Sequence, residues 1–308
     1  MNKLNEFQQV LLQTFKEFAR FCNQNDIKYF AAFGTLLGVI RHHGFIPWDD
    51  DIDVMMLRED YEKFLVYREK LRGTSYWVSD IRDGEHPYAF AKFYTNACTV
   101  WEVRQFPFII GPWIDIFPVD EYTPSSETDS KLYDEYHHAL WNYRKAMSYQ
   151  SWKEIGTDFI RLNGFNGPIK LVKQCVYKPF KKWYFNKVMR LQNAVNAVRG
   201  THYKPWTEVK RRIYDKEWFA EAQPMPFEDT TMLVPNGWHE LLTDSYGDYM
   251  TPPPPDKQVP NHHYYFVDLT KAMTRNEIES SASLVKTEAS PLSFKVLIDE
   301  IKHRKGFN

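Results

Sequence analysis

Residues 33–60 read FGTLLGVIRHHGFIPWDDDIDVMMLRED. This stretch contains a Gly-Thr pair, an apolar segment as long as one short helix, and four carboxylates within five residues. Acidic and apolar residues then alternate, which is typical of a strand with one polar face. Because side chains two apart on a strand point the same way, we expect Asp51 and Asp53 to project together. The pattern therefore predicts a helix over residues 34–41 and a strand over residues 51–56.

Two carboxylates held close together repel each other unless a cation lies between them. Oxygen ligands of this kind suit Mg²⁺ or Mn²⁺, and magnesium commonly leaves positions for water and substrate phosphates. Gly34 and Thr35 open the predicted helix, where backbone N–H groups attract phosphate and the Thr35 hydroxyl adds a donor. Arg41, at the other end of that helix, contacts either phosphate or a structural acidic partner. The stretch indicates a phosphoryl-transfer metal site, with a solvated strand edge as the alternative.

Other acidic residues fall into two groups. Asp49 and Asp50 follow a Pro-Trp pair and are interpreted as capping or turn residues. Asp115 stands alone among large apolar residues in the segment WIDIF. A charge in such a setting is costly unless it is paired or binds a metal. Asp115 is therefore predicted to complete a three-carboxylate site, with a strand-end cap or an ion pair as the alternative, and Asp120 is interpreted as a turn residue.

The order of predicted elements is α+β, with a mixed β-sheet at the centre flanked by helices. Predicted helices cover residues 4–23, 34–41, 58–71, 131–149, 237–246 and 292–304. Predicted strands cover residues 27–33, 51–56, 76–79, 90–94, 98–103, 113–119 and 230–234. We expect a catalytic core in residues 1–150, a basic helical insertion in residues 151–225, and a C-terminal part in residues 226–308 that packs back on the core.

The composition excludes several classes of protein. The chain has 308 residues, 43% apolar and 17% aromatic, so it can bury a large core and whole-chain disorder is excluded. No apolar run approaches the ~20 residues of a membrane-spanning helix, and the N-terminus lacks a signal-peptide pattern. Three widely spaced cysteines argue against a disulfide framework and a zinc site. We expect a cytoplasmic protein in a reducing compartment.

The net charge of −1 is a cancellation between two parts of the chain. Ten basic residues and no acidic ones lie between Phe159 and Thr207, which leaves −11 on the rest. Apolar residues recur there at helical spacing, and Pro179 interrupts them, so we expect two helices or one kinked helix. Such a basic amphipathic helix is suited to peripheral contact with an anionic membrane, at the inner face of the cell membrane; a packed helix with a solvated basic face is the alternative. No nucleic-acid partner is expected.

The acidic stretch resembles the LicD family of bacterial phosphorylcholine transferases, which is more distantly similar to the fukutin group. The segment GTLLGVIRHHGFIPWDDDID at residues 34–53 carries most of the resemblance. Further matches are IDIFPVD at 114–120, SYGDYMTPPP at 245–254, Arg58, Asp60, Tyr61, Lys257, His262 and His263. The resemblance runs from about residue 25 to residue 265, but residues 149–224 resemble no family that we can name.

The resemblance implies a nucleotidyltransferase core of the DNA polymerase β superfamily. That superfamily's pattern falls here on Gly34 with Thr35, Asp51 with Asp53, and Asp115. The resemblance further implies a CDP-activated donor, most often CDP-choline, and two Mg²⁺ or Mn²⁺ ions held by these carboxylates. A sugar hydroxyl of a glycan or lipid-linked glycan acceptor, such as teichoic acid, lipopolysaccharide or capsule, would attack and release CMP. Asp115 is the best candidate for the general base.

The residues leave several points open. Trp48 adjoins the acidic run and can contact a quaternary ammonium through its ring face, with core packing as the alternative. Lys92 and Arg104 are weaker candidates for phosphate contact, with exposed strand cations as the alternative. Transfer of the nucleotide itself, or non-catalytic glycan or choline binding on the same scaffold, remain alternative functions. The donor headgroup can equally be ethanolamine, aminoethylphosphonate, glycerol phosphate or a sugar phosphate.

Overall fold

The computed structural model describes residues 4–148, 175–207, 212–260, 262 and 264–281. The strands of its central sheet are β1 (Phe30–Ala31), β2 (Asp53–Leu57), β3 (Tyr76–Ser79), β4 (Ala91–Thr95), β6 (Trp113–Tyr122), β7 (His202–Lys204) and β8 (Tyr214–Asp215). The strand order is β1-β2-β6-β4-β3, and β7 and β8 extend the sheet beyond the end of β6. Strands β2 and β6 are parallel and the other pairs are antiparallel, so the sheet is mixed.

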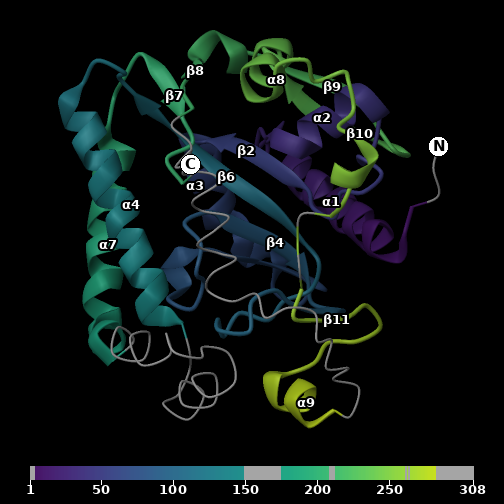
Figure 1. Ribbon diagram of the computed structural model, residues 1–308, viewed down its shortest axis with the longest axis vertical. Helices are drawn as coiled ribbons and strands as arrows, with labels where there is room; N and C mark the ends of the chain where they lie inside the picture. The colour runs from purple at the N-terminus through teal and green to yellow at the C-terminus, as the bar shows by residue number, and fades with distance from the viewer. Residues whose placement is uncertain (1–3, 149–174, 208–211, 261, 263, 282–308) are drawn as a thin grey trace.

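Helices flank this sheet, as Figure 1 shows. They are α1 (Glu6–Gln24), α2 (Phe33–His42), α3 (Arg58–Tyr67), α4 (Glu127–Met147), α7 (Lys181–Ala197) and α8 (Trp238–Tyr246). A short helix, α9 (Arg275–Ser280), lies apart from the sheet at the bottom of the view. Helices α4 and α7 lie side by side on the left of the view, whereas α1 and α2 lie on the right. Two further pairs, β9 (Ala222–Phe227) with β10 (Thr230–Pro235) and β5 (Thr99–Trp101) with β11 (Phe266–Asp268), are antiparallel. The predicted α+β class with a mixed sheet is confirmed.

Local sequence explains why α1 forms and where it packs. Asn5 caps its N-terminus, and Gln8 completes a capping box. On its buried face, Phe18 is 0% exposed and packs edge-on against Phe93 of β4 and Phe64 of α3. Edge-to-face aromatic pairs add to the hydrophobic stabilisation of such a core. The contact fixes α1 against the central sheet.

Most predicted elements occur with shifted ends. The helix predicted over residues 131–149 begins earlier, at Glu127, because the Ser126 side chain accepts a hydrogen bond from the Asp129 N–H. The helix predicted over residues 58–71 is α3 followed by a 3₁₀ turn, Arg68–Leu71. The helix predicted over residues 292–304 and the expected domain boundary near residue 150 both lie outside the described residues.

Asp120 is not a turn residue, so that interpretation is wrong. It lies inside β6, is 2% exposed, and its two carboxylate oxygens accept hydrogen bonds from Nε and Nη2 of Arg58, each at 2.7 Å. Burial would lower the pKa of Arg58, but Asp120 outweighs it and raises the pKa above its ordinary value. This two-point ion pair fastens the start of α3 to the sheet.

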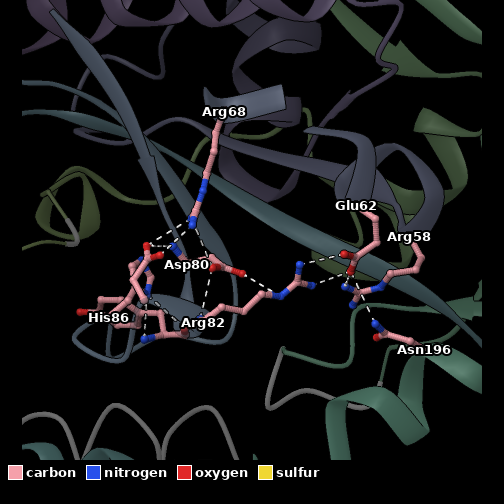
Figure 2. Close-up of polar contacts among 9 residues, drawn as sticks. Arg58, Glu62, Arg68, Asp80, Arg82, His86 and Asn196 are labelled. Carbon is pink, nitrogen blue, oxygen red and sulfur yellow. Dashed lines mark hydrogen bonds and ion pairs between the residues drawn. The ribbon is translucent and has the colours of Figure 1, made fainter. Parts of the chain in front are cut away.

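A chain of charged side chains continues from this pair, as Figure 2 shows. Glu62 contacts Arg58 at 2.9 Å and Arg82 at 2.6 Å. Arg82 in turn lies 3.3 Å from the buried Asp80. From α7, the Asn196 amide donates a hydrogen bond of 3.5 Å to Glu62. The network links α3, the Asp80 turn and α7, which are far apart in the sequence.

The basic segment is interrupted at Pro179, as predicted. A 3₁₀ turn at Lys178–Phe180 contains this proline and leads directly into α7. In α7, Val188 and Leu191 are buried, and the helix packs along α4. Within the described part of the chain, no helix is both long and apolar enough to cross a bilayer.

Candidate active site

Sheet register brings three predicted site residues together. On the parallel pair β2 and β6, Asp53 lies opposite Asp115. On the antiparallel pair β4 and β6, Lys92 lies opposite the same Asp115. The three residues therefore form one row across adjacent strands, where neighbouring side chains are close enough to interact. Charged side chains at such positions need opposite charges close by, either from within the row or from a bound ligand.

Lys92 provides part of that compensation. Its Nζ donates a hydrogen bond of 2.7 Å to Oδ1 of Asp115, and its side chain is 2% exposed. The ammonium also lies 4.0 Å from the ring centroid of Trp113 and 4.7 Å from that of Tyr88. The alternative of an exposed strand cation is therefore wrong for Lys92. Its charge is held by one carboxylate and by aromatic rings, which favour a cation over their faces.

The start of α2 is built differently from expectation. The Thr35 hydroxyl accepts a hydrogen bond of 2.8 Å from the Asp53 N–H, so it anchors the first residue of β2. At Gly34, an added Cβ would lie 3.0 Å from Oδ2 of Asp49. Glycine at this position therefore lets a carboxyl group approach the N-terminus of α2, where the positive end of the helix dipole favours negative charge. In this structure that group is the Asp49 carboxyl.

Asp49 belongs to the acidic cluster as well as to a turn. Its N–H donates to the Ile46 carbonyl at 2.9 Å, which agrees with the predicted turn. Its carboxyl is buried and close enough to that of Asp51 for the two to influence each other. Burial first, and then the charge and hydrogen bond of Asp51 and the charge of Asp50, raise the pKa of Asp49 to about 8. Interpreting it as a turn residue alone missed this contact.

The strand that was predicted over residues 51–56 begins only at Asp53, so Asp51 lies in the preceding loop. The Ile52 carbonyl accepts a hydrogen bond of 2.9 Å from the Asp115 N–H, and Asp53 is bonded to Thr35 and to the Ala32 N–H, so the pairing of this segment reaches back to Ile52 but not to Asp51. The two carboxylates are nevertheless close enough to interact. Burial, then the charges of Asp51 and Asp115, raise the pKa of Asp53 well above its ordinary value.

A histidine from the far end of the chain reaches this loop. Nδ1 of His262 lies 3.0 Å from Oδ1 of Asp50 and 3.7 Å from Oδ2 of Asp51. Burial alone would lower the pKa of His262, but the hydrogen bond to Asp50 and the charges of Asp51 and Asp50 raise it to about 10. The hydroxyl of Tyr264 donates to the Asp50 carbonyl at 3.2 Å. Sequence reasoning noted His262 only as part of a motif, because 212 residues separate it from Asp50.

Glu102 is a site-proximal carboxylate that the sequence reasoning missed. It accepts a hydrogen bond of 2.8 Å from the Tyr88 hydroxyl, and its charge influences the pKa values of Asp115 and His262. It follows β5, whose last residue Trp101 pairs with β11. No local motif marks Glu102, and its contact with Tyr88, 14 residues away, is decided by the tertiary structure.

Arg41 and Trp48 lie toward the other end of α2. Arg41 donates through Nη1 to the Tyr249 carbonyl at 2.8 Å and through Nε to His42 at 2.9 Å. Burial lowers the pKa of Arg41. Trp48 is half-buried, with its ring edge-on to His42 at 6.5 Å between centroids. The structure thus gives both residues contacts within the chain, and their predicted contacts with substrate stay predictions.

The donor set suits a hard divalent cation in its chemistry. Carboxylates crowd at the start of β2, and burial, followed by the neighbouring negative charges, raises the pKa values of Asp49 and Asp53. Among the residues that the structure describes, however, no three His, Cys, Asp or Glu side chains are grouped to hold a metal ion. Asp115 is engaged by Lys92 instead. The predicted three-carboxylate site is therefore not preassembled, and metal binding stays a prediction.

The mixed sheet, the charged row of Asp53, Asp115 and Lys92, and the carboxylates of the loop before β2 define an α+β protein with a buried, acidic site. Residues 26–148 match the family model described as "LicD/FKTN/FKRP, nucleotidyltransferase domain". The chain is similar to the lipopolysaccharide cholinephosphotransferase LicD of Haemophilus influenzae, with 27% identity over 263 residues, 84% of this chain and 96% of that protein. Uncharacterised proteins of Rickettsia prowazekii and Rickettsia typhi share 46% identity over 50 residues, 16% of this chain and 19% and 16% of theirs. The chain therefore carries a LicD-family domain.

Proposed function

We propose that this protein transfers phosphocholine from a CDP-activated donor to a sugar hydroxyl of lipopolysaccharide, with release of CMP. The observation that carries the proposal is the similarity to a lipopolysaccharide cholinephosphotransferase over 96% of that protein's length. The charged row of Asp53, Asp115 and Lys92 supports it, because phosphoryl transfer asks a protein mainly for positioning and charge stabilisation.

We further propose that the core has the nucleotidyltransferase fold of the DNA polymerase β superfamily. The parallel pair β2 and β6 supports this, since it sets one acid of the acidic run beside the later acid. Gly34 and Thr35 support it too, because they sit at the start of α2 immediately beside that acidic run.

Asp51, Asp53 and Asp115 would hold the Mg²⁺ or Mn²⁺ that this chemistry uses. When bound, such an ion neutralises the donor diphosphate and the leaving nucleotide. Magnesium is usually held through one or two carboxylates with substrate phosphates filling other positions. The metal site is not preassembled in the protein alone, which is consistent with this mode of binding, because the phosphates of the donor would supply the remaining ligands.

The chain's own residues have separable roles in this proposal. Lys92 holds Oδ1 of Asp115 and so fixes the orientation of that carboxylate. The second oxygen, Oδ2, would accept the proton of the attacking hydroxyl when Asp51 and Asp53 hold the ion, and would itself bind the ion otherwise. Burial raises the pKa of Asp115, whereas the charge and hydrogen bond of Lys92 lower it, with a net rise. A raised pKa makes the carboxylate a better proton acceptor. His262 balances the charge of Asp50 and Asp51 until the donor binds.

The experiment is a donor screen on the purified chain with Mg²⁺ or Mn²⁺ and lipopolysaccharide. CMP release should occur with CDP-choline, and the mass of the acceptor should rise by one phosphocholine. A different CDP-compound that turns over in its place corrects the headgroup while retaining the reaction class. A gain of a nucleotide on the acceptor identifies a nucleotidyltransferase instead, which the description of the matching family domain also allows. Failure of every CDP-donor to bind or react rejects the proposal.

A further inference from the structure

The apolar side of the basic segment is divided into a buried half and an exposed half. Val188 and Leu191, in the second half of α7, are 0% and 6% exposed where the helix packs along α4. Val176, Phe180 and Trp183, at and before its first turn, are 56%, 53% and 56% exposed. Single exposed apolar residues are ordinary on a protein surface, but three within eight residues are not. The sequence pattern placed both halves on one apolar side and left open whether that side packs or contacts a membrane.

The three exposed side chains lie within one short stretch of the chain. Phe180 and Trp183 are three residues apart and share one side of the start of α7. Val176 precedes the 3₁₀ turn at Lys178–Phe180, which leads directly into α7. We call Val176, Phe180 and Trp183 the exposed aromatic face.

Positive charge surrounds the exposed aromatic face. Lys181 and Lys182 lie between its two aromatic residues, and Nζ of Lys187 lies 5.7 Å from the ring centroid of Trp183. No acidic residue occurs between Phe159 and Thr207. The neighbouring helix adds to this charge, because Lys145 in the last turn of α4 lies 4.8 Å from the ring centroid of Tyr177 and the 3₁₀ turn packs against α4. Figure 1 shows this end of the α4–α7 pair at the lower left, at the periphery of the molecule.

We propose that the exposed aromatic face and its lysines dock on the surface of an anionic lipid bilayer. Trp and Phe rings are stable at the level of the lipid headgroups, where the ring is partly apolar and partly wet. Lysines beside them reach anionic headgroups while their aliphatic stems lie along the apolar surface. An acidic polymer in solution would use the lysines but would leave Phe180 and Trp183 in water. The bilayer therefore accounts for both the charge and the exposed rings, whatever reaction the acidic site performs.

Vesicle co-sedimentation of the full chain tests this. Wild type should bind vesicles of phosphatidylcholine mixed with phosphatidylglycerol, and should not bind phosphatidylcholine alone. The variant K181Q/K182Q should lower the partition coefficient by roughly 20- to 30-fold, since each lysine contributes about fivefold. The variant F180S/W183S should lower it by about tenfold or more. The matched controls are V66S, which removes a side chain that is 69% exposed on α3, and K131Q, which removes an exposed lysine on α4.

Both controls should bind as wild type does, and circular dichroism should show every variant folded. The proposal is overturned if wild type does not bind the anionic vesicles, or if F180S/W183S binds them as tightly as V66S. Sedimentation velocity gives a further test. A wild-type dimer that F180S/W183S converts to a monomer, with no vesicle binding by either, assigns the exposed aromatic face to contact between copies of this chain and also overturns the proposal.

Discussion

Nζ of Lys92 lies 2.7 Å from Oδ1 of Asp115, and the sheet register sets the two residues opposite each other on β4 and β6. Trp113, which begins β6, covers the same ammonium with its ring. Lysine and aspartate side chains exposed by only 2% and 10% depend on each other for compensation of their charge. This pair is therefore both a structural contact and a constraint on how Asp115 can act.

Replacing Lys92 by methionine leaves Asp115 buried without its cation. Removing one partner of a buried pair costs about 3–5 kcal/mol. We expect K92M to lower the free energy of unfolding by that amount, measured by urea denaturation. The double variant K92M/D115N should recover part of the loss, because no uncompensated carboxylate remains. Equal stability of K92M and wild type would show that the pair is not coupled in solution.

The proposed role of Asp53 predicts a loss of activity without a loss of stability. D53N should lower the rate of phosphocholine transfer by about 100-fold or more, since charge stabilisation at the reacting phosphate is worth several kcal/mol. Because burial and neighbouring carboxylates raise the pKa of Asp53, removing its charge should leave the melting temperature equal or higher. The control is D229N, at a carboxylate whose side chain is 60% exposed. An active D53N enzyme would remove Asp53 from the mechanism.

The pair of Arg58 and Asp120 should be important for stability alone. R58M leaves the buried Asp120 carboxylate uncompensated and should lower the free energy of unfolding by about 3–5 kcal/mol. K131M is the matched control, because Lys131 forms a pair with Glu127 in which the side chains are 72% and 82% exposed. Such surface pairs contribute about 0.5 kcal/mol or less. Chemical denaturation of R58M and K131M measures how much each lowers the free energy of unfolding. Equal decreases in the two variants would contradict the prediction.

The raised pKa of Asp49 predicts a pH dependence of stability. The ordinary pKa of an Asp carboxyl is 3.8, and that of Asp49 in the folded chain is about 8. At pH values between these two, Asp49 has lost its carboxyl proton in the unfolded chain but keeps it in the folded chain. Raising the pH through this window therefore favours unfolding, so stability contributed by the neutral carboxyl is lost. Thermal melts between these limits should show a falling melting temperature in wild type and a flatter curve in D49N. Parallel curves would mean that Asp49 titrates normally.

Several parts of this picture follow from local sequence. The Gly-Thr pair and the apolar residues after it predict α2, and the alternation after the acidic run predicts β2. The single charge within WIDIF correctly singles out Asp115 as a residue that needs a partner. The partner itself, Lys92, is not deducible in this way, because it lies 23 residues away and only the antiparallel pairing of β4 with β6 sets it opposite Asp115.

Other errors have the same origin. Asp120 carries no local sign of its pairing with Arg58, 62 residues away, and was assigned to a turn. Val176, Phe180 and Trp183 continue the periodicity of Val188 and Leu191, yet only the latter two are buried where α7 packs along α4. Periodicity reports which side chains share a face, whereas burial depends on how far the neighbouring helix extends.

The sequence alone determined the α+β class, the acidic run and the concentration of positive charge between residues 159 and 207, because these depend on residue type and spacing. Only the tertiary structure decided that Asp53, Asp115 and Lys92 form one row, and that His262 reaches Asp50. Strand register and the return of a distant segment decide these contacts, and both depend on packing free energy summed over the whole core.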